Sequence, residues 1–221
     1  MGNTTVPAVN GVSLSLIQGD FVAIAGPSGS GKTTILNIIG LIDRPTEGRV
    51  TIASRDTLSM KSGELTRMRR RVVGFIFQSF NLISGLNVIE NVELPLLIGR
   101  SSMKKKERKA WVNYLLDEVG LSERKKHRPR ELSGGQQQRV AIARALAAKP
   151  SIVIADEPTA NLDSVTGRNI LSLMKKINQE QKTTFVFSTH DEVIHRMADH
   201  VVSLKDGKVE KEIKREGGAE A

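Results

Sequence analysis

A glycine-rich loop between an apolar strand pattern and an apolar helix pattern is the first feature of this sequence that could do chemistry. It matches GxxxxGK[ST] at every defined position, and with the next residue it comprises Gly26, Pro27, Ser28, Gly29, Ser30, Gly31, Lys32, Thr33 and Thr34. Glycines let backbone N–H groups approach phosphate oxygens without a Cβ in the way, and the start of the following helix adds a positive dipole end. In this pattern Lys32 reaches the β- and γ-phosphates and Thr33 offers its hydroxyl to Mg²⁺. The loop therefore predicts a site for a phosphate-rich ligand.

Two adjacent carboxylates, Asp156 and Glu157, end a second apolar run that starts at Ile152. Parallel-sheet enzymes place their chemistry at the carboxyl ends of strands, and successive side chains on a strand diverge toward different partners. Asp156 suits Mg²⁺, through a water molecule, because Mg²⁺ prefers hard oxygen ligands and keeps several waters. Glu157 suits polarisation of an attacking water, which is the work of a general base.

Two further polar residues follow strand patterns. Gln78 ends the run from Val73 and could sense Mg²⁺ or the water, and His190 follows the run from Thr184. A lone histidine after a strand is more often structural than catalytic. At the same sheet edge as the glycine-rich loop, however, it could contact a γ-phosphate.

The elements that must position these residues alternate between short apolar runs and helical patterns, which indicates an α/β fold with a mostly parallel sheet. The predicted strands are residues 21–25, 73–77, 152–155, 184–188 and 201–204. Asp206 and Gly207 predict a hairpin turn into a final strand, residues 208–213. The tail from Glu216 is expected to fray.

Between about Leu82 and Lys149 the strand patterns stop and apolar residues fall at helical spacing. We therefore expect a nucleotide-binding core made of residues 1–82 and 150–221, with a helical subdomain, residues 83–149, inserted into it. Trp111 and Tyr114 are interpreted as packing residues of that subdomain rather than ligand contacts.

Composition limits the classes of function. The chain has 221 residues, a net charge of +9, 4% aromatic residues and no cysteine. The charge could serve nucleic acid, an anionic membrane or phosphorylated ligands, but the basic runs near Arg69 and Lys105 are interpreted as solvated helix faces. Scarce aromatics argue against single-strand nucleic-acid binding, and the lack of cysteine excludes disulfides and thiolate metal sites. We see neither a secretory signal nor a membrane span.

The segment Leu132-Ser133-Gly134-Gly135-Gln136 resembles the LSGGQ signature of ABC ATPases at all five positions. The resemblance implies a P-loop NTPase (RecA-like) core with an N-terminal antiparallel β portion and an inserted helical subdomain. It also implies hydrolysis of ATP with Mg²⁺. In this family Gln78 is similar to the Q-loop residue, Asn161-Leu162-Asp163 to the D-loop, and His190 to the switch histidine.

The same resemblance implies partners. Ser133, Gly134, Gly135 and Gln136 begin a helix whose donors suit a γ-phosphate, and in the family they serve a nucleotide held by the other subunit. Asp163 is expected beside that nucleotide. We therefore expect a second copy of the chain, an integral membrane permease and no nucleic acid. The expected location is the cytoplasmic face of the inner membrane, as a peripheral subunit.

Within the family, residues 41–48, 77–83 and 90–96 resemble most the ATPases of lipoprotein release and macrolide export, the LolD and MacB group. An importer ATPase differs only in its permease and remains an alternative. A DNA-maintenance ABC ATPase is more remote, because the roughly hundred residues between loop and signature hold no heptad run and the chain has no zinc cysteines. A module that binds ATP without turnover is disfavoured by the presence of Glu157 and His190.

One feature departs from the family. ABC ATPases usually carry an aromatic residue upstream of the first core strands, stacked on adenine, whereas no aromatic precedes Val9. Either the start is truncated or adenine is held in another way. The loss of one stacking contact is expected to weaken binding by about 1 kcal/mol. Weak affinity or broad base preference is thus expected, and titration with ATP and GTP would test it.

Overall fold

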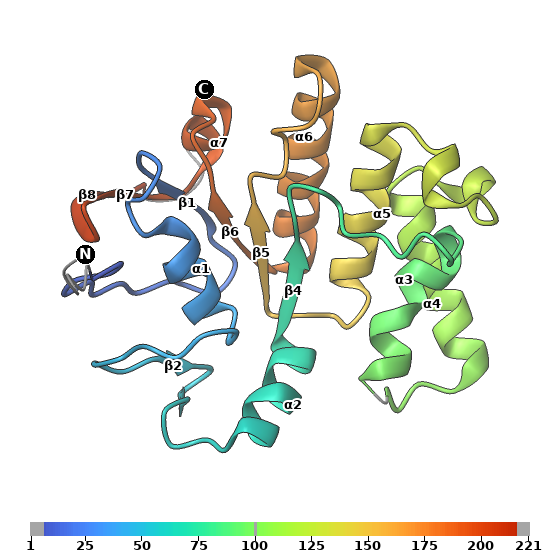
Figure 1. The fold of residues 1–221 in the computed structure, drawn as a ribbon. Coiled ribbons are helices and arrows are strands. Elements are labelled where there is room, and N and C mark those ends of the chain that lie inside the picture. Colours follow the sequence, from blue (N-terminus) through green and yellow to red (C-terminus); the bar gives the residue numbers. More distant parts are fainter. Residues whose placement is uncertain (1–6, 100, 216–221) are drawn as a thin grey trace, which may run out of the picture.

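The computed structural model describes residues 7–99 and 101–215 (Figure 1). The expectation of a frayed tail from Glu216 concerns residues outside these ranges.

The centre of the molecule is a six-stranded sheet with strand order β4-β5-β6-β1-β7-β8. Its strands are β1 (Phe21–Ala25), β4 (Val73–Ile76), β5 (Ile152–Asp156), β6 (Thr184–Ser188), β7 (His200–Lys205) and β8 (Lys208–Lys214). All neighbours pair in parallel except β7 and β8, which form the predicted hairpin across Asp206 and Gly207. The α/β class and every predicted strand are confirmed, with ends that differ by no more than one residue.

The N-terminal antiparallel portion is small and begins late in the chain. Two short strands, β2 (Thr51–Ile52) and β3 (Arg55–Asp56), pair after the first helix rather than at the N-terminus. Residues 7–20 form no strand, although Val9, Val12, Leu14 and Leu16 pack against the core. One backbone hydrogen bond, from Asn10 N to Gly207 O at 2.7 Å, joins this segment to the β7–β8 turn. A single bond does not make a ladder, so the alternating apolar residues pack without pairing.

The strands are apolar on both faces, so helices cover both sides of the sheet. Along β1, Val22 and Ile24 face one apolar cluster, together with helix α1 (Lys32–Ile39) and helix α2 (Ser62–Val72). Phe21 and Ala23 face the other, larger cluster, which includes residues of α6 (Ser164–Gln181) and α7 (Glu192–Met197). This arrangement leaves the strand ends as the exposed places for chemistry.

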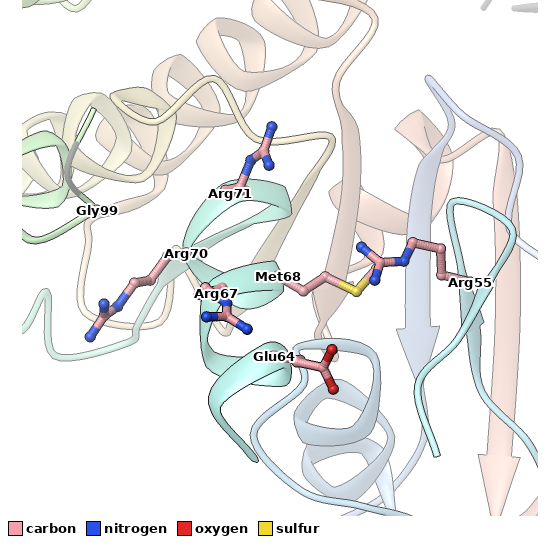
Figure 2. A pocket seen from close by; sticks show the side chains of 7 residues that line it. All are labelled: Arg55, Glu64, Arg67, Met68, Arg70, Arg71 and Gly99. Carbon is pink, nitrogen blue, oxygen red and sulfur yellow. The ribbon is translucent and has the colours of Figure 1, made fainter. Parts of the chain in front are cut away.

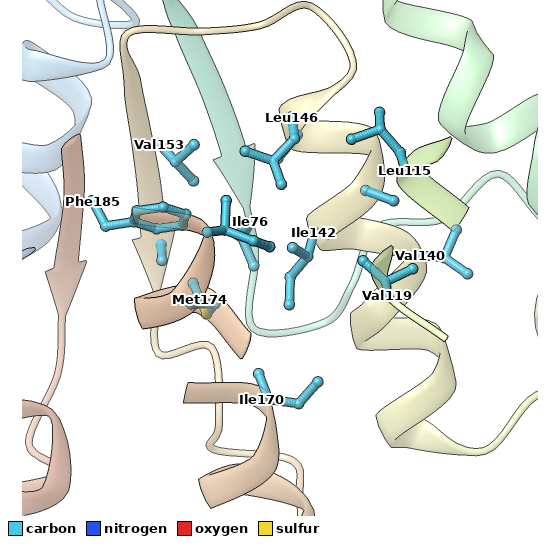
Figure 3. Packing of buried hydrophobic residues seen from close by; sticks show 14 of the residues in the cluster. Ile76, Leu115, Val119, Val140, Ile142, Leu146, Val153, Ile170, Met174 and Phe185 are labelled. Atoms are coloured by element: carbon cyan, nitrogen blue, oxygen red, sulfur yellow. The ribbon is translucent and has the colours of Figure 1, made fainter. Parts of the chain in front are cut away.

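In the described part of residues 83–149, for which a helical subdomain was expected, the regular elements are helices. They are α3 (Val88–Ile98), α4 (Lys105–Glu118), α5 (Gly134–Leu146) and two short 3₁₀ turns, Ser122–Arg124 and Pro129–Glu131. Their buried residues belong to the same cluster as the sheet: Figure 3 shows Ile142 and Leu146 of α5 between Ile76 of the sheet and Leu115 of α4. The helices are therefore anchored to the sheet through α5, which lies against it in Figure 1.

Trp111 packs as expected. Its indole N–H donates to Ala147 O at 2.9 Å, and the Lys149 ammonium lies 4.4 Å from the ring centroid. Tyr114 stacks on Trp111 at 5.3 Å between ring centroids but remains 44% exposed. The two stacked aromatic rings therefore pack α4 against the residues that follow α5.

We expect Leu116→Ala to lower the free energy of unfolding by about 2–5 kcal/mol, because the side chain is fully buried in the larger cluster and its removal leaves a cavity. Urea unfolding followed by circular dichroism measures this. Leu97→Ala is the matched control: Leu97 is 51% exposed, so its removal should change stability by no more than about 0.5 kcal/mol. Equal effects of the two variants would contradict the packing described.

The basic residues of α2 surround a hollow of about 450 Å³ that also includes Arg55 and Gly99 (Figure 2). Arg70 and Arg71 point away from one another in this view rather than toward one point. A phosphate site needs donors that converge, so the arrangement agrees with the interpretation of a solvated helix face. Of the helices in the described ranges, none combines the length and apolar character needed to cross a membrane.

Candidate active site

Four neighbouring parallel strands bring the predicted polar residues to one edge of the sheet. Strand β1 leads into the loop at Gly26, and β5 ends at Asp156 with Glu157 next. Gln78 follows β4 by two residues, and His190 follows β6 by two. Because β4, β5, β6 and β1 pair in parallel, all these positions lie at their carboxyl ends. Residues far apart in sequence thus share one site.

The glycine-rich loop has the backbone that a phosphate cradle needs. Gly26 and Gly31 adopt φ values of 146° and 98°, and a Cβ would collide with Leu204 O at the first and with Ala8 O at the second. A side chain is therefore excluded at both positions for two reasons, conformation and space. Pro27, Ser28 and Gly29 are exposed, so the outer turn of the loop is open to a ligand.

Lys32 lies across this loop at the start of α1. Its ammonium donates to Gly26 O at 2.7 Å and to Pro27 O at 3.0 Å, which places the positive charge beside the loop backbone. Ser30 is buried, and its hydroxyl has no hydrogen-bond partner in the described part of the chain. Thr33 and Thr34 follow in the first turn of α1. A positive charge, a helix start and flexible glycines are the features that fit a polyphosphate.

Glu157 and His190 form a direct pair. The distance from His190 Nδ1 to Glu157 Oε1 is 2.9 Å. Glu157 is held in place by its own backbone, which adopts a φ of 44° and donates from N to Ser188 O at 3.0 Å. The carboxylate side chain is 19% exposed and the imidazole 79% exposed. The pair therefore links a sheltered carboxylate to a histidine that a ligand can reach.

Three oxygen-bearing side chains at this edge suit a divalent cation. Thr33, Gln78 and Asp156 make no side-chain hydrogen bond within residues 7–99 and 101–215, so their oxygen atoms are available. No group of three His, Asp or Glu residues in that part of the chain could hold a metal by itself. This donor set fits Mg²⁺, which is commonly held by one or two protein oxygens together with phosphate oxygens and water.

The signature residues begin α5, on the other side of the sheet from the loop. Ser133 Oγ accepts from Gln136 N at 3.3 Å, and Gln136 Oε1 accepts from Ser133 N at 3.0 Å, which makes a capping box. Gly135 packs against Thr166 of α6, where no Cβ would fit. Figure 1 shows β4 and β5 between α1 and α5. One chain therefore does not bring its own signature to its own glycine-rich loop.

Asp163 caps α6. Its carboxylate accepts from Val165 N at 3.1 Å and from Thr166 N at 3.0 Å. Hydrogen bonds from the side chain and backbone of Thr166 hold the pKa of Asp163 below its ordinary value. They outweigh desolvation, which raises this pKa, and the Val165 N–H adds a smaller lowering effect. Asp163 therefore orders the turn between β5 and α6.

The low pKa of Asp163 predicts a pH-dependent contribution to stability. A carboxyl whose pKa is depressed by folding stabilises the protein above its ordinary pKa, and this contribution is lost as pH falls through the folded pKa. We therefore expect Asp163→Ala to be less stable than the parent at neutral pH, with a gap that narrows in acid. Thermal unfolding between neutral and acidic pH measures the gap. Asp163→Asn keeps an uncharged cap, so the difference in thermal stability between Asp163→Asn and Asp163→Ala should not depend on pH.

Sequence reasoning gave no role to Arg144 and named Asn161 only as part of the D-loop segment, but both residues make contacts that shape the site. Asn161 Nδ2 donates to Gln78 O at 2.9 Å. Arg144 donates from Nη2 to Phe80 O at 2.7 Å and from Nη1 to Asn81 O at 2.6 Å. The sequence does mark Arg144 as unusual, because it is the one charged residue in the apolar run 140–148, which begins within α5 and continues just past its end. A charge on a largely buried helix face needs partners, and the turn after Gln78 that supplies them cannot be predicted from the helix sequence.

Comparisons with known proteins identify the family of this chain. Residues 9–160 match the model of the family described as "ABC transporter". The uncharacterized ABC transporter ATP-binding protein MJ0796 of Methanocaldococcus jannaschii is 50% identical over 98% of this chain and 93% of its own length. The structure titled as a dimeric, post-hydrolysis state of the MJ0796 cassette bound to ADP and Pi superimposes with a TM-score of 0.88, at 49% identity and over 98% of this chain and 94% of that one.

Two transport proteins are similar over nearly the same span. The lipoprotein-releasing system ATP-binding protein LolD 1 of Rhodopseudomonas palustris is 46% identical over 91% of this chain and 88% of its own length. The macrolide export ATP-binding/permease protein MacB of Bdellovibrio bacteriovorus is 45% identical over 95% of this chain but only 32% of its own length. A family match over most of the chain and relatives at this identity establish that the chain belongs to the ABC transporter family, as an ATP-binding subunit of the kind that hydrolyses ATP.

Proposed function

We propose that the carboxyl edge of β1, β4, β5 and β6 is the site of hydrolysis of ATP with Mg²⁺. The loop residues 26–34 hold the phosphates, with the Lys32 ammonium near the β- and γ-phosphates and the glycine amides around them. Thr33, Gln78 and Asp156 hold Mg²⁺, Asp156 through a water. When bound, Mg²⁺ neutralises charge that develops on the phosphate oxygens. The supporting observation is that separate strands place these donors at one sheet edge.

Glu157 is proposed as the general base. Its carboxylate accepts a proton from the attacking water, while the Glu157–His190 pair keeps that carboxylate in one orientation. His190 also has an exposed ring, 79% accessible, which can contact the γ-phosphate. Gln78, which follows the neighbouring strand β4, orients the attacking water. Glu157, His190 and Gln78 all lie at the same sheet edge as the glycine-rich loop.

A second copy of the chain completes the site in this proposal. Ser133, Gly134, Gly135 and Gln136 lie at the N-terminus of α5, where the N–H groups of Gly134 and Gly135 and the helix dipole favour an anion. Because α5 lies across the sheet from the loop in Figure 1, that anion belongs to a nucleotide on another chain. Two chains related by a two-fold axis then enclose two nucleotides, with Asp163 near the junction. The dimeric structure of the MJ0796 cassette supports this arrangement.

The chain is proposed to drive a membrane permease. Relatives named for lipoprotein release and for macrolide export favour an exporter over an importer, and MacB joins its ATPase to a permease in one chain. The core formed by residues 1–82 and 150–221 closes on ATP, and residues 83–149 with Gln78 transmit the movement. In this proposal the chain lies at the cytoplasmic face of the inner membrane, as a peripheral subunit. Nucleic acid is not among the proposed partners.

The contact between Glu157 and His190 is the main observation behind the proposed hydrolysis, and the variant His190→Ala tests it. We expect kcat for ATP to fall at least about tenfold, because both the γ-phosphate contact and the support of Glu157 are lost. The affinity for ATP should stay near that of the parent, since the loop is unchanged. His127→Ala is the control, because His127 contacts Arg124 in the helical stretch. Parental turnover in His190→Ala would remove His190 from the mechanism.

A further inference from the structure

We propose that Arg144 is a positioning residue that fixes the backbone turn after Gln78 and so makes the orientation of Gln78 depend on the signature helix. This rests on the proposed role of Gln78 in holding Mg²⁺ and orienting the water. Arg144 lies in the last turn of α5, whereas Ser133 caps the first turn of the same helix. The two ends of one rigid element thus contact two different functional segments.

The contact between Arg144 and the turn uses both arms of the guanidinium. Nη2 donates to Phe80 O at 2.7 Å, and Nη1 donates to Asn81 O at 2.6 Å. A planar fork that binds two successive carbonyl oxygens fixes both the position and the tilt of that peptide segment. A lysine at the same place could keep the charge but not this geometry.

The turn has a backbone that needs such support. Phe80 and Asn81 have φ values of 59° and 47°, in the left-handed region that residues with a Cβ seldom adopt. Conformations of this kind persist where surrounding contacts hold them. The turn follows Gln78 by two residues, so its relaxation would move Gln78 directly.

The charge of Arg144 is satisfied by this turn. The side chain is half-buried, and desolvation lowers the pKa of Arg144 from its ordinary value. Across residues 7–99 and 101–215, none of the ion pairs includes Arg144. A half-buried cation without a carboxylate depends on the carbonyl dipoles that it binds. The arginine and the turn therefore hold each other in place.

Further contacts join α5, the turn after Gln78 and the segment after Glu157. A Cβ built on Gly134 would lie 3.8 Å from the Phe80 ring and 3.5 Å from Leu162 Cδ2. Asn161 donates to Gln78 O at 2.9 Å, and Gln138 of α5 donates to Pro158 O at 2.8 Å. The signature helix is thus packed against both the turn after Gln78 and the segment after Glu157. Movement of α5 cannot leave Gln78 undisturbed.

A double-mutant cycle tests the inference. ATP turnover is measured as a function of Mg²⁺ for the parent, Gln78→Ala, Arg144→Lys and the double variant. We expect Arg144→Lys to lower kcat about tenfold and to raise the Mg²⁺ concentration for half-maximal turnover, with little change in the thermal midpoint. Because Arg144 acts through Gln78, the double variant should be no slower than Gln78→Ala alone. If the fall in kcat of the double variant equalled the product of the two single-variant falls, the two residues would act independently and the proposal would be overturned.

Arg139→Lys is the matched control. Arg139 lies on the same helix and donates to one carbonyl, Val119 O at 3.0 Å. That carbonyl belongs to the helical stretch and not to the turn after Gln78. It should keep the parental Mg²⁺ dependence; a shift equal to that of Arg144→Lys would mean that any loosening of α5 has this effect and would overturn the proposal. If Arg144→Lys fails to fold, Arg144→Gln enters the same cycle.

The cycle also separates this inference from the function on which it rests. Parental turnover and Mg²⁺ dependence in Gln78→Ala would refute the role of Gln78 itself. A slow Gln78→Ala with parental kinetics in Arg144→Lys would refute only the positioning by Arg144.

Discussion

Replacement of Glu157 by glutamine is expected to reduce ATP turnover by about 10²- to 10⁴-fold while ATP still binds. The reason is local. Glu157 directly follows the strand that ends at Asp156, and its carboxylate lies 2.9 Å from His190 Nδ1. An amide of nearly the same shape therefore removes the base but preserves the site. Phosphate release in the steady state gives turnover, and equilibrium binding of a fluorescent ATP analogue gives affinity.

The control for this variant is Glu192→Gln. Glu192 is an exposed residue of α7, paired with Arg196 at 3.5 Å, and its replacement should leave turnover unchanged. If Glu157→Gln turned over ATP at the parental rate, another group would have to act as the base. If it lost affinity as well as turnover, Glu157 would be a binding residue instead.

The second large effect concerns Ser133. In the Glu157→Gln background, ATP should double the mass measured by light scattering, because unhydrolysed nucleotide keeps two chains together. Adding Ser133→Arg should abolish this doubling. The arginine removes the cap that Ser133 Oγ provides to Gln136 N and places a long cation where the second chain's nucleotide is proposed to lie. Binding of ATP to the monomer should persist, because the glycine-rich loop lies across the sheet from α5.

Ser151→Arg is the control for Ser133→Arg. Ser151 is exposed and precedes β5, at the opposite sheet edge from the proposed site, so the same substitution there should permit doubling. Doubling by the Ser133→Arg chain would place the signature outside the interface. A monomer for the Glu157→Gln chain itself, at saturating ATP, would count against a dimer that forms without the permease.

Much of the fold was predictable because its determinants are local. Each buried strand reads as a short apolar run, and the glycines of residues 26–31 identify the loop whatever surrounds it. The Asp206-Gly207 turn likewise predicts its hairpin from two residues. The unpaired chain at residues 7–20 was not predictable in this way, because pairing depends on whether a partner strand is within reach.

The sequence alone determined which chemical groups the site contains and that strand ends would carry them, because residue type and local periodicity are properties of short segments. Only the tertiary structure decided the strand order β4-β5-β6-β1-β7-β8, and with it every distance between those groups. The pair of Glu157 with His190 spans 33 residues, and the contact of Arg144 with Phe80 spans 64. Such contacts arise when separate segments bury their apolar faces against one sheet, and no single segment contains that information.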